Sequence, residues 1–233
     1  MVAALTTISE VLTFTLLSTS LWLTLQVYVR HYGPIPSARR IIKVNSWMYT
    51  VVSFTIFLFV ITVPESPTGT DTDGIAGKPN HPFGASAAAT RYIYHLSKFC
   101  EFLDILLVCA AGSPINLHFG FHHLTTPYLT FIRFLPTTGA EHSDSDGWRA
   151  FAAANTFHHV LMYAYFGGAS ILRPILPWTG TLQLVVGIAV DLAVGFWRFR
   201  AGDDGIYWLY FASAGLLGVY FVLHVRDLRA RRI

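Results

Sequence analysis

Charged residues are scarce in this sequence, because Asp, Glu, Lys and Arg together occupy only 12% of its 233 positions. A soluble domain of this length carries about a quarter charged residues. Hydrophobic residues, in contrast, make up 53% of the chain. This balance excludes an ordinary water-soluble domain and indicates that lipid surrounds much of the chain.

Cysteine is also rare, and its placement excludes a disulfide framework. Cys100 and Cys109 fall in one apolar segment and form no CxxC pair, so we interpret them as buried free thiols. No basic stretch interleaved with aromatic residues indicates a nucleic-acid partner. No charged residues precede the first apolar run as they would in a cleaved signal peptide.

Long apolar runs predict an all-α membrane protein with about seven transmembrane helices in a single domain over residues 1–233. A helix needs roughly 20 apolar residues to span the hydrocarbon core. The expected spans are Thr6–Val29, Ser46–Val63, Ala87–Ala111, Ile115–Leu135, Ala150–Phe166, Trp178–Phe199 and Ile206–Val225.

Lys and Arg gather after the first span and at the C-terminus, two regions that share one side of the membrane when the number of spans is odd. These residues are Arg30, Arg39, Arg40, Lys43, Arg226, Arg229, Arg231 and Arg232. Basic loops face the cytoplasm. We therefore expect a cytoplasmic C-terminus and a lumenal or external N-terminus.

Several spans carry polar residues that are costly in a membrane, by at least a few kcal/mol for an ionisable group, and that are functional candidates for this reason. With the orientation above, most of them fall in the cytoplasmic half of their helices, so four helices should converge on one site. They are Lys98, Glu101 and Asp104, then His118, His122 and His123, then Asn155, His158, His159, Tyr163 and Tyr165, and finally Gln183.

Helical spacing groups these side chains further. Lys98 and Glu101 are three residues apart, so they can pair on one face. Asn155, His159 and Tyr163 follow each other at intervals of four and form a stripe that offers hydrogen-bonding and acid–base groups. By comparison, His95 and His224 are interpreted as packing or interfacial residues. Asp191 has no partner that the sequence indicates.

Two of these runs resemble motifs of the ELO fatty-acid elongases. The run Lys98–Asp104 resembles the KxxExxDT motif, with Ile105 in place of the Thr. The run Asn155–Phe166 resembles NxxxHxxMYxYY, with only the last Tyr replaced. Gln183 fits the first glutamine of TxxQxxQF, whereas Val186 stands at the second.

The histidine box departs from the family pattern. ELO proteins have HxxHH, whereas this chain has His118-Phe-Gly-Phe-His122-His123, which is HxxxHH. Either Phe119 replaces the first histidine, or an inserted residue is absorbed by a π-bulge near Gly120. We favour the bulge.

The resemblance implies a condensing enzyme, an acyltransferase of the endoplasmic reticulum membrane that makes 3-oxoacyl-CoA, CO₂ and CoA from acyl-CoA and malonyl-CoA. It implies six helices around an acyl tunnel, one helix outside, and no metal or cofactor. Other enzymes of the elongation cycle and a second copy of the chain are further candidate partners. The expected catalytic residues are His118, His122, His123, Asn155, His159 and Tyr163; the expected substrate-binding residues are Lys98, Glu101, Asp104, Met162, Tyr165 and Gln183.

A neutral imidazole can attack the thioester, and His122 is the first candidate for this role, with His159 the second. Donors aimed at the enolate oxygen, which forms when malonyl-CoA loses CO₂, stabilise it; Asn155, His159 and Tyr163 could supply them. Lys98 is expected either to hold the histidine box or to meet CoA phosphates.

Three alternatives stay open at this point. Membrane di-iron desaturases and hydroxylases also use histidine boxes, including HxxxHH, but such sites draw on more histidines than the box and the His158-His159 pair supply here. A seven-span receptor or transporter explains the helices but not the motifs. An elongase fold without turnover, acting as a regulatory partner, would explain the departures from the family pattern.

Overall fold

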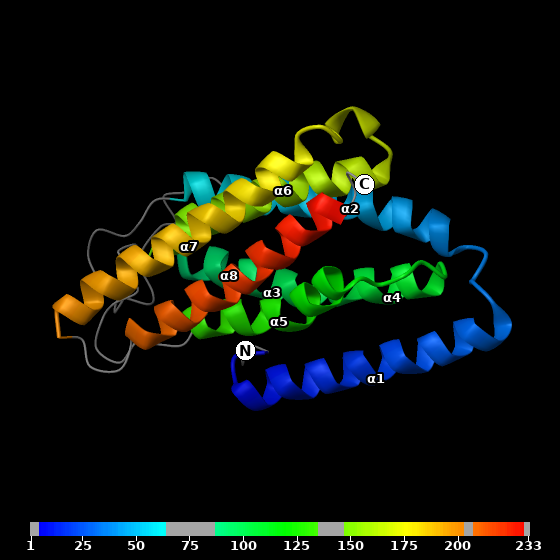
Figure 1. Cartoon of the computed structure of the whole chain (residues 1–233), viewed down its shortest axis with the longest axis horizontal. Coiled ribbons are helices and arrows are strands. Elements are labelled where there is room, and N and C mark those ends of the chain that lie inside the picture. Colours follow the sequence, from blue (N-terminus) through cyan, green and yellow to red (C-terminus); the bar gives the residue numbers. More distant parts are fainter. Residues whose placement is uncertain (1–4, 64–86, 135–146, 203–206, 231–233) are drawn as a thin grey trace, which may run out of the picture.

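The computed structural model describes residues 5–63, 87–134, 147–202 and 207–230, and every regular element in these ranges is helical (Figure 1). The elements are α1 (Ile8–Tyr32), α2 (Ala38–Thr62), α3 (Ala87–Cys100), α4 (Phe102–Ala110), α5 (Leu117–Phe134), α6 (Trp148–Gly167), the 3₁₀-helix η2 (Ser170–Leu172), α7 (Leu176–Arg200) and α8 (Tyr207–Ala230). The prediction of an all-helical chain is confirmed.

The observed helices agree with the expected spans to within three residues at each end except at three places: the start of α2, the expected third span, and the end of α8, which continues five residues past Val225 to Ala230. Helix α2 begins at Ala38, eight residues before the expected start at Ser46. Its first turns carry Arg39, Arg40 and Lys43. These basic residues delay the start of the apolar run in the sequence, but they are part of the helix. The expected third span is divided into α3 and α4.

The division between α3 and α4 occurs at Glu101. The carbonyl oxygen of Glu101 accepts the Asp104 N–H at 3.1 Å, a bond one residue shorter than the α-helical pattern. The same oxygen lies 2.9 Å from Nδ1 of His123, on α5. A side chain that takes the place of a backbone hydrogen-bond partner is a known cause of helix breaks. The contact of His123 with the Glu101 carbonyl therefore accounts for the break between α3 and α4.

Six helical rods pack in a closed ring when α3 and α4 are counted as one broken rod. Around this ring α2 packs on α6, α6 on α7, α7 on α8, α8 on α5, α5 on α3, and α3 and α4 on α2. Helix α1 stays outside and packs on α4 and α5; it runs along the lower edge of the molecule in Figure 1. Polar residues of the expected site face the interior of the ring.

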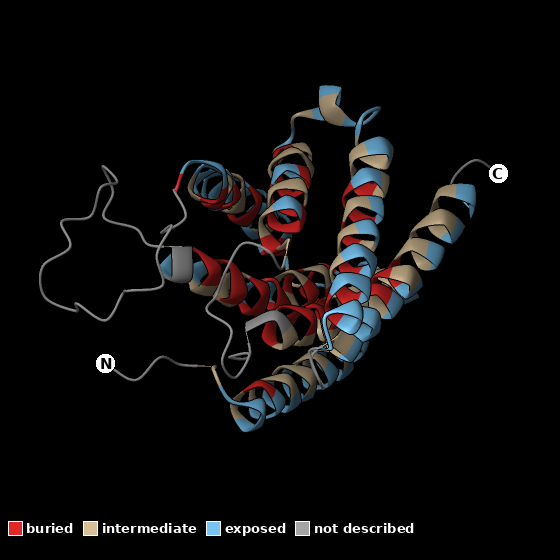
Figure 2. Ribbon diagram, turned by 90° about the vertical axis from the view of Figure 1, so that its left-hand side faces the viewer, coloured by how far each residue is buried: buried red, intermediate tan, exposed pale blue. Residues whose placement is uncertain are grey.

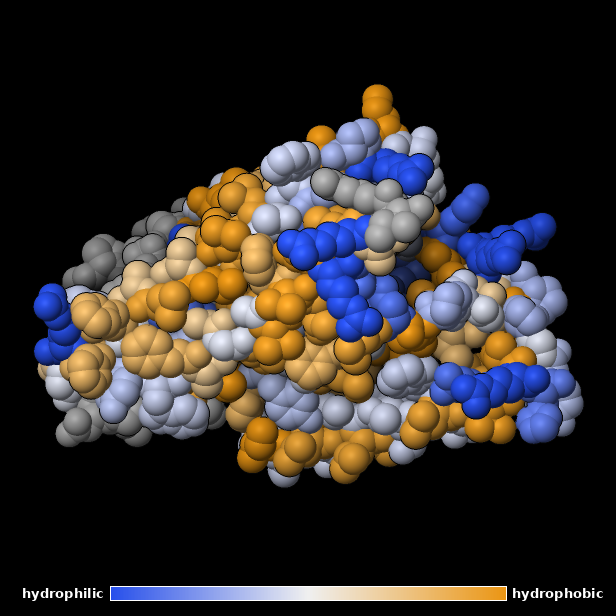
Figure 3. Space-filling view, in the orientation of Figure 1, coloured by the Kyte–Doolittle hydropathy of each residue, from blue (hydrophilic) through white to orange (hydrophobic). Residues whose placement is uncertain are grey.

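The outer surface suits a lipid environment. Helices α1, α2, α7 and α8 are long and apolar enough to cross a membrane, whereas α5, α6 and the divided α3–α4 rod carry the polar residues. Val11 is the buried residue of α1, and the exposed side chains of this helix include Leu16 and Leu17. Figure 2 shows that buried residues gather toward the interior and that exposed ones cover the outer faces of the helices. Figure 3 shows hydrophobic side chains over much of one face, with hydrophilic ones gathered toward the end where α1 gives way to α2. Such extensive exposed apolar surface marks a membrane protein.

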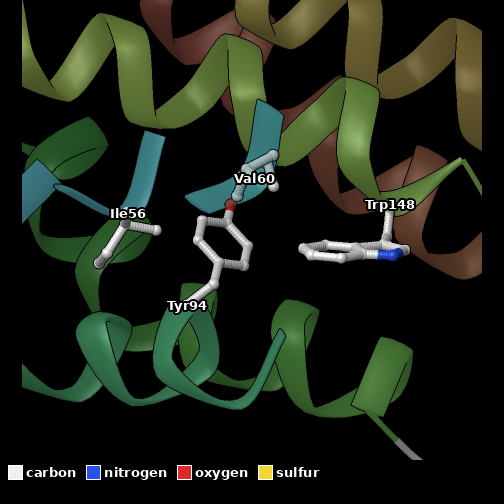
Figure 4. Packing of buried hydrophobic residues seen from close by; sticks show 5 residues of the cluster. Ile56, Val60, Tyr94 and Trp148 are labelled. Carbon is white, nitrogen blue, oxygen red and sulfur yellow. The ribbon is translucent and has the colours of Figure 1, made fainter. Parts of the chain in front are cut away.

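A buried apolar cluster between α2, α3 and α6 supports the ring beneath the site. It consists of Ile56, Val60, Tyr94, Trp148 and Ala152. Figure 4 shows the Tyr94 ring between the aliphatic side chains of α2 and the indole of Trp148. The Tyr94 hydroxyl reaches beyond this cluster and donates to Asn155 at 2.9 Å, so the same residue packs the core and holds a residue of the site.

Candidate active site

A buried ion pair lies at the centre of the ring. Lys98 Nζ donates to Glu101 Oε1 at 2.7 Å and to Asn155 Oδ1 at 2.7 Å. Lys98 and Glu101 are each only 2% exposed, and the predicted pairing of these two residues is confirmed. Because Lys98 is enclosed in this way, its position favours the role of holding the site over contact with CoA phosphates.

Asn155 joins three helices through its amide group. Its Oδ1 accepts from Lys98 and from Tyr94, both on α3, and its Nδ2 donates to Gln183 Oε1 on α7 at 2.7 Å. These three hydrogen bonds fix the orientation of the buried Asn155 amide. Asn155 therefore determines which way the Gln183 amide faces.

Two histidines of the expected site contact Glu101 from different sides. His159 Nδ1 lies 3.3 Å from Glu101 Oε1, on the same oxygen that Lys98 binds. His123 Nδ1 lies 2.9 Å from the Glu101 carbonyl oxygen. Both rings are buried. Glu101 thus positions one imidazole through its carboxylate and the other through its backbone.

His122 differs from its neighbours because its Nδ1 is buried without a hydrogen-bond partner among the described residues. Glu101 Oε2 is unpartnered in the same sense. The His122 ring packs against Tyr220, with ring centroids 4.8 Å apart. Buried polar atoms without partners are uncommon and require an explanation. A nitrogen kept available for a substrate is one such explanation.

Asp104 holds a second group of side chains nearer the end of the ring. Asn45 Nδ2 donates to Asp104 Oδ1 at 3.0 Å. The Tyr163 hydroxyl donates to Asp104 Oδ2, and the Tyr163 ring stacks on Tyr49 with centroids 4.9 Å apart. The Asn155, His159 and Tyr163 stripe is therefore confirmed as an inward face of α6, because all three are buried.

These groups surround a pocket of about 370 Å³. Its wall comes from the start of α2, the end of α4, the start of α5, the later half of α6, the early part of α7 and the end of α8. Apolar contributions include Ile42, Leu107, Met162 and Leu184. The pocket therefore opens at the end of the ring that carries Arg39, Arg40, Lys43, Arg226 and Arg229.

The structure brings all but one of the expected site residues to this region. Eight line the pocket: Asp104, His118, His122, His123, His159, Met162, Tyr163 and Gln183. Lys98, Glu101 and Asn155 form the network directly behind the wall. Tyr165 is the exception, because it packs beside Phe166 and does not line the pocket.

Comparison with known proteins decides the family. A family model described as ELO, the GNS1/SUR4 family, matches residues 3–226. The chain belongs to the ELO family. Fatty acid elongase A of Dictyostelium discoideum is 30% identical over 124 residues, which cover 50% of this chain and 42% of that relative. The chain therefore aligns with less than half of the relative's length. No solved structure matches the chain.

The ELO histidine box departs from its usual spacing here without a π-bulge, so the bulge that we favoured is wrong. Helix α5 is α-helical from Leu117 to Phe134, including Gly120. Phe119 therefore occupies the place of the first box histidine, and its ring packs on His123 with centroids 4.4 Å apart. His118, one residue earlier, lines the pocket in a different direction and lies 3.5 Å from Asp227.

The sequence did not single out several residues that line the pocket. They include Asn45, Asn116 and Asp227. Asn116 could have been recognised as an N-cap, because its side chain accepts the Phe119 N–H at 2.7 Å. Asp227 could have been noticed because it is an acidic residue between the basic residues Arg226 and Arg229.

Three further expectations are settled outside the pocket. His95 is a packing residue as expected: it is buried, and Nδ1 lies 2.8 Å from Thr130 Oγ1. Cys100 is exposed rather than buried, although both cysteines are free as expected. Asp191 has a partner, because Ser213 donates to it at 2.6 Å.

One group of three potential metal ligands occurs among the described residues. Donor atoms of Glu101, His122 and His159 lie within 4.8 Å of one another. Lys98 already donates to this carboxylate and balances its charge. The other pocket histidines contact protein acceptors instead of turning toward a shared centre. This arrangement fits the ELO family better than a di-iron enzyme.

Proposed function

We propose that this ELO protein is the condensing enzyme of fatty-acid elongation, joining malonyl-CoA to an acyl-CoA to give 3-oxoacyl-CoA, CO₂ and CoA. The observation that carries the proposal is the buried, unpartnered Nδ1 of His122 at the wall of the pocket. A neutral imidazole nitrogen in this state can attack a thioester carbonyl carbon and hold the acyl group. His122 is therefore the proposed nucleophile.

The second half of the reaction needs hydrogen-bond donors for the enolate that decarboxylation of malonyl-CoA generates. His159 and Tyr163 line the pocket beside His122 and are the proposed donors. Asn155 lies behind them and acts by orienting Gln183. The Lys98–Glu101 pair keeps the imidazoles of His123 and His159 in place.

The acyl chain is proposed to lie within the ring of six helices, with α1 outside. Support comes from the apolar part of the pocket wall, because each methylene that leaves water for such a surface gains about 0.8 kcal/mol. The CoA portion would then remain at the open end, where Arg39, Arg40 and Lys43 begin α2 and attract phosphate groups.

The proposed location is the endoplasmic reticulum membrane, with the open end of the pocket and the C-terminus in the cytoplasm and the N-terminus in the lumen. The supporting observation is that the pocket shares one end of the ring with Arg39, Arg40, Lys43, Arg226 and Arg229, whereas Arg198 and Arg200 lie at the other end, in the last turn of α7. Positively charged ends of membrane helices face the cytoplasm. CoA esters made there could then enter directly. Other enzymes of the elongation cycle and a second copy of the chain are the proposed partners.

Membranes containing the protein, labelled malonyl-CoA and a panel of acyl-CoAs test this function. We expect label in 3-oxoacyl-CoA, a preference among acyl lengths, and loss of label in His122→Ala. His31→Ala is the matched control, because His31 is exposed at the end of α1 and should leave incorporation unchanged. Correctly inserted protein that incorporates no label with any primer would refute the activity and favour the regulatory alternative.

A further inference from the structure

An imidazole–carboxylate pair stands at the mouth of the pocket, on residues outside the ELO motif positions. His118 Nδ1 lies 3.5 Å from Asp227 Oδ2, and the two side chains are 21% and 23% exposed. Asn116 Nδ2 donates to the same carboxylate oxygen at 2.9 Å. The pair thus links the start of α5 to the end of α8, and it meets solvent.

The inner side of His118 faces the proposed nucleophile. The rings of His118 and His122 are 6.1 Å apart between centroids, and both line the pocket. His158 is bonded to Thr179, and His123 contacts the Glu101 carbonyl. His118 is therefore the pocket histidine that has a carboxylate on its solvent side and the nucleophile on its inner side.

The proposed reaction, on which this inference rests, consumes a proton from solution in each turnover. Malonyl-CoA contributes a carboxylate that leaves as neutral CO₂, and the CoA released from the acyl-CoA leaves as a thiol. Charge therefore balances only if one proton enters. The proton is needed where the first CoA departs, which is the mouth of the pocket.

We propose that His118, supported by Asp227, donates this proton to the sulfur of the departing CoA. His122 Nδ1 forms a bond to the carbonyl carbon, the carbon–sulfur bond breaks, and its electron pair passes to sulfur. The His118 imidazolium transfers its proton to that sulfur and gives CoA thiol and an acyl-imidazolium on His122. Attack by the decarboxylating malonyl unit then returns His122 to the neutral form, and water at the mouth reprotonates His118.

Several titratable groups surround His118 among the described residues, and Asp227 is the carboxylate in direct contact with it. A carboxylate stabilises the imidazolium, so release of thiol should decline at alkaline pH, where an imidazole carries no proton to give. The groups that face His118 or line the same pocket are Asp227 and His224 on α8, His122 and His123 on α5, Asp104 on α4, and His158, His159 and Tyr163 on α6.

A single-turnover assay with acyl-CoA alone, followed by the thiol released, measures the step directly. His118→Gln removes the proton but keeps a polar side chain against Asp227. General acids contribute about 10²–10⁴ in rate, and thiols leave readily, so we expect a loss of about a hundredfold at the pH optimum. We also expect the fall at alkaline pH to disappear.

An aryl thioester of the same acyl group provides the decisive second primer, because its thiol is acidic enough to leave without a proton. His118→Gln should therefore release this thiol at nearly the wild-type rate. Asp227→Asn should keep the alkaline fall but move it to lower pH. His31→Gln, an exposed histidine at the same end of the ring, should match wild type in every respect.

The inference is overturned if His118→Gln keeps the wild-type rate and pH profile. An equal loss with both primers would also overturn it, because that result indicates a merely structural residue. Failure of the proposed function gives a different result, because the wild-type protein itself would then make no 3-oxoacyl-CoA. A condensing wild-type enzyme with an unaffected His118→Gln variant refutes this inference alone.

Discussion

Replacement of Lys98 by Met should destabilise the protein strongly. The substitution leaves Glu101, which is 2% exposed, as a buried carboxylate without its cation, and it removes two hydrogen bonds of 2.7 Å. Breaking a buried ion pair by removing one partner costs about 3–5 kcal/mol. For a chain of this size each kcal/mol lowers Tm by roughly 2–4 °C. We therefore expect Tm in detergent to fall by roughly 6–20 °C.

The paired variant Lys98→Met with Glu101→Gln separates charge burial from simple loss of contacts. Removing both charges should restore at least half of the lost Tm, since no uncompensated charge remains. Lys43→Met is the control, because Lys43 is exposed on α2 and should change stability by less than about 0.5 kcal/mol. All four proteins are compared at one heating rate. A Lys98→Met Tm equal to that of Lys43→Met, or a double variant whose Tm does not rise above that of Lys98→Met, would refute the reasoning.

Three further substitutions, one of them a control, test the packing around the site by the same thermal assay. Gly187→Ala places a Cβ 2.6 Å from the Phe151 ring, and such overpacking costs about 1–3 kcal/mol, whereas Gly218→Ala meets nothing within 4 Å and should be neutral or slightly stabilising. If both glycine variants have the same Tm, the helix at Gly187 does not pack against the Phe151 ring as closely as the structure shows. Tyr94→Phe removes one hydrogen bond to Asn155 and should cost about 1 kcal/mol while keeping label incorporation within about tenfold of wild type. A complete loss of activity would show that Tyr94 does more than hold that amide.

Much of the fold follows from patterns that act within a single helix. Apolar runs identify the spans, because a helix in lipid satisfies its own backbone groups. Spacing of three or four residues placed Lys98 with Glu101 and aligned Asn155 with His159. The start of α2 was missed because hydropathy reports contact with lipid, and a helix continues through basic residues such as Arg39 without a change in backbone geometry.

Features that depend on contacts between distant segments could not be predicted from patterns within a single helix. Asn116 and Asp227 are 111 residues apart in the sequence, and nothing in either segment specifies that α5 and α8 meet there. The break at Glu101 depends on a ring from α5. The HxxxHH spacing suggested a bulge, but α5 keeps its regular geometry and presents Phe119 instead, which only the packing of that ring against His123 reveals.

The most direct test of the central claim is mass spectrometry of the purified protein after incubation with acyl-CoA and no malonyl-CoA. We predict one acyl group per chain, located on His122 by peptide mapping, absent from His122→Ala, and discharged when malonyl-CoA is added. An acyl group on another residue, or a His122→Ala variant that makes 3-oxoacyl-CoA at the wild-type rate, would contradict the assignment of His122 as the nucleophile.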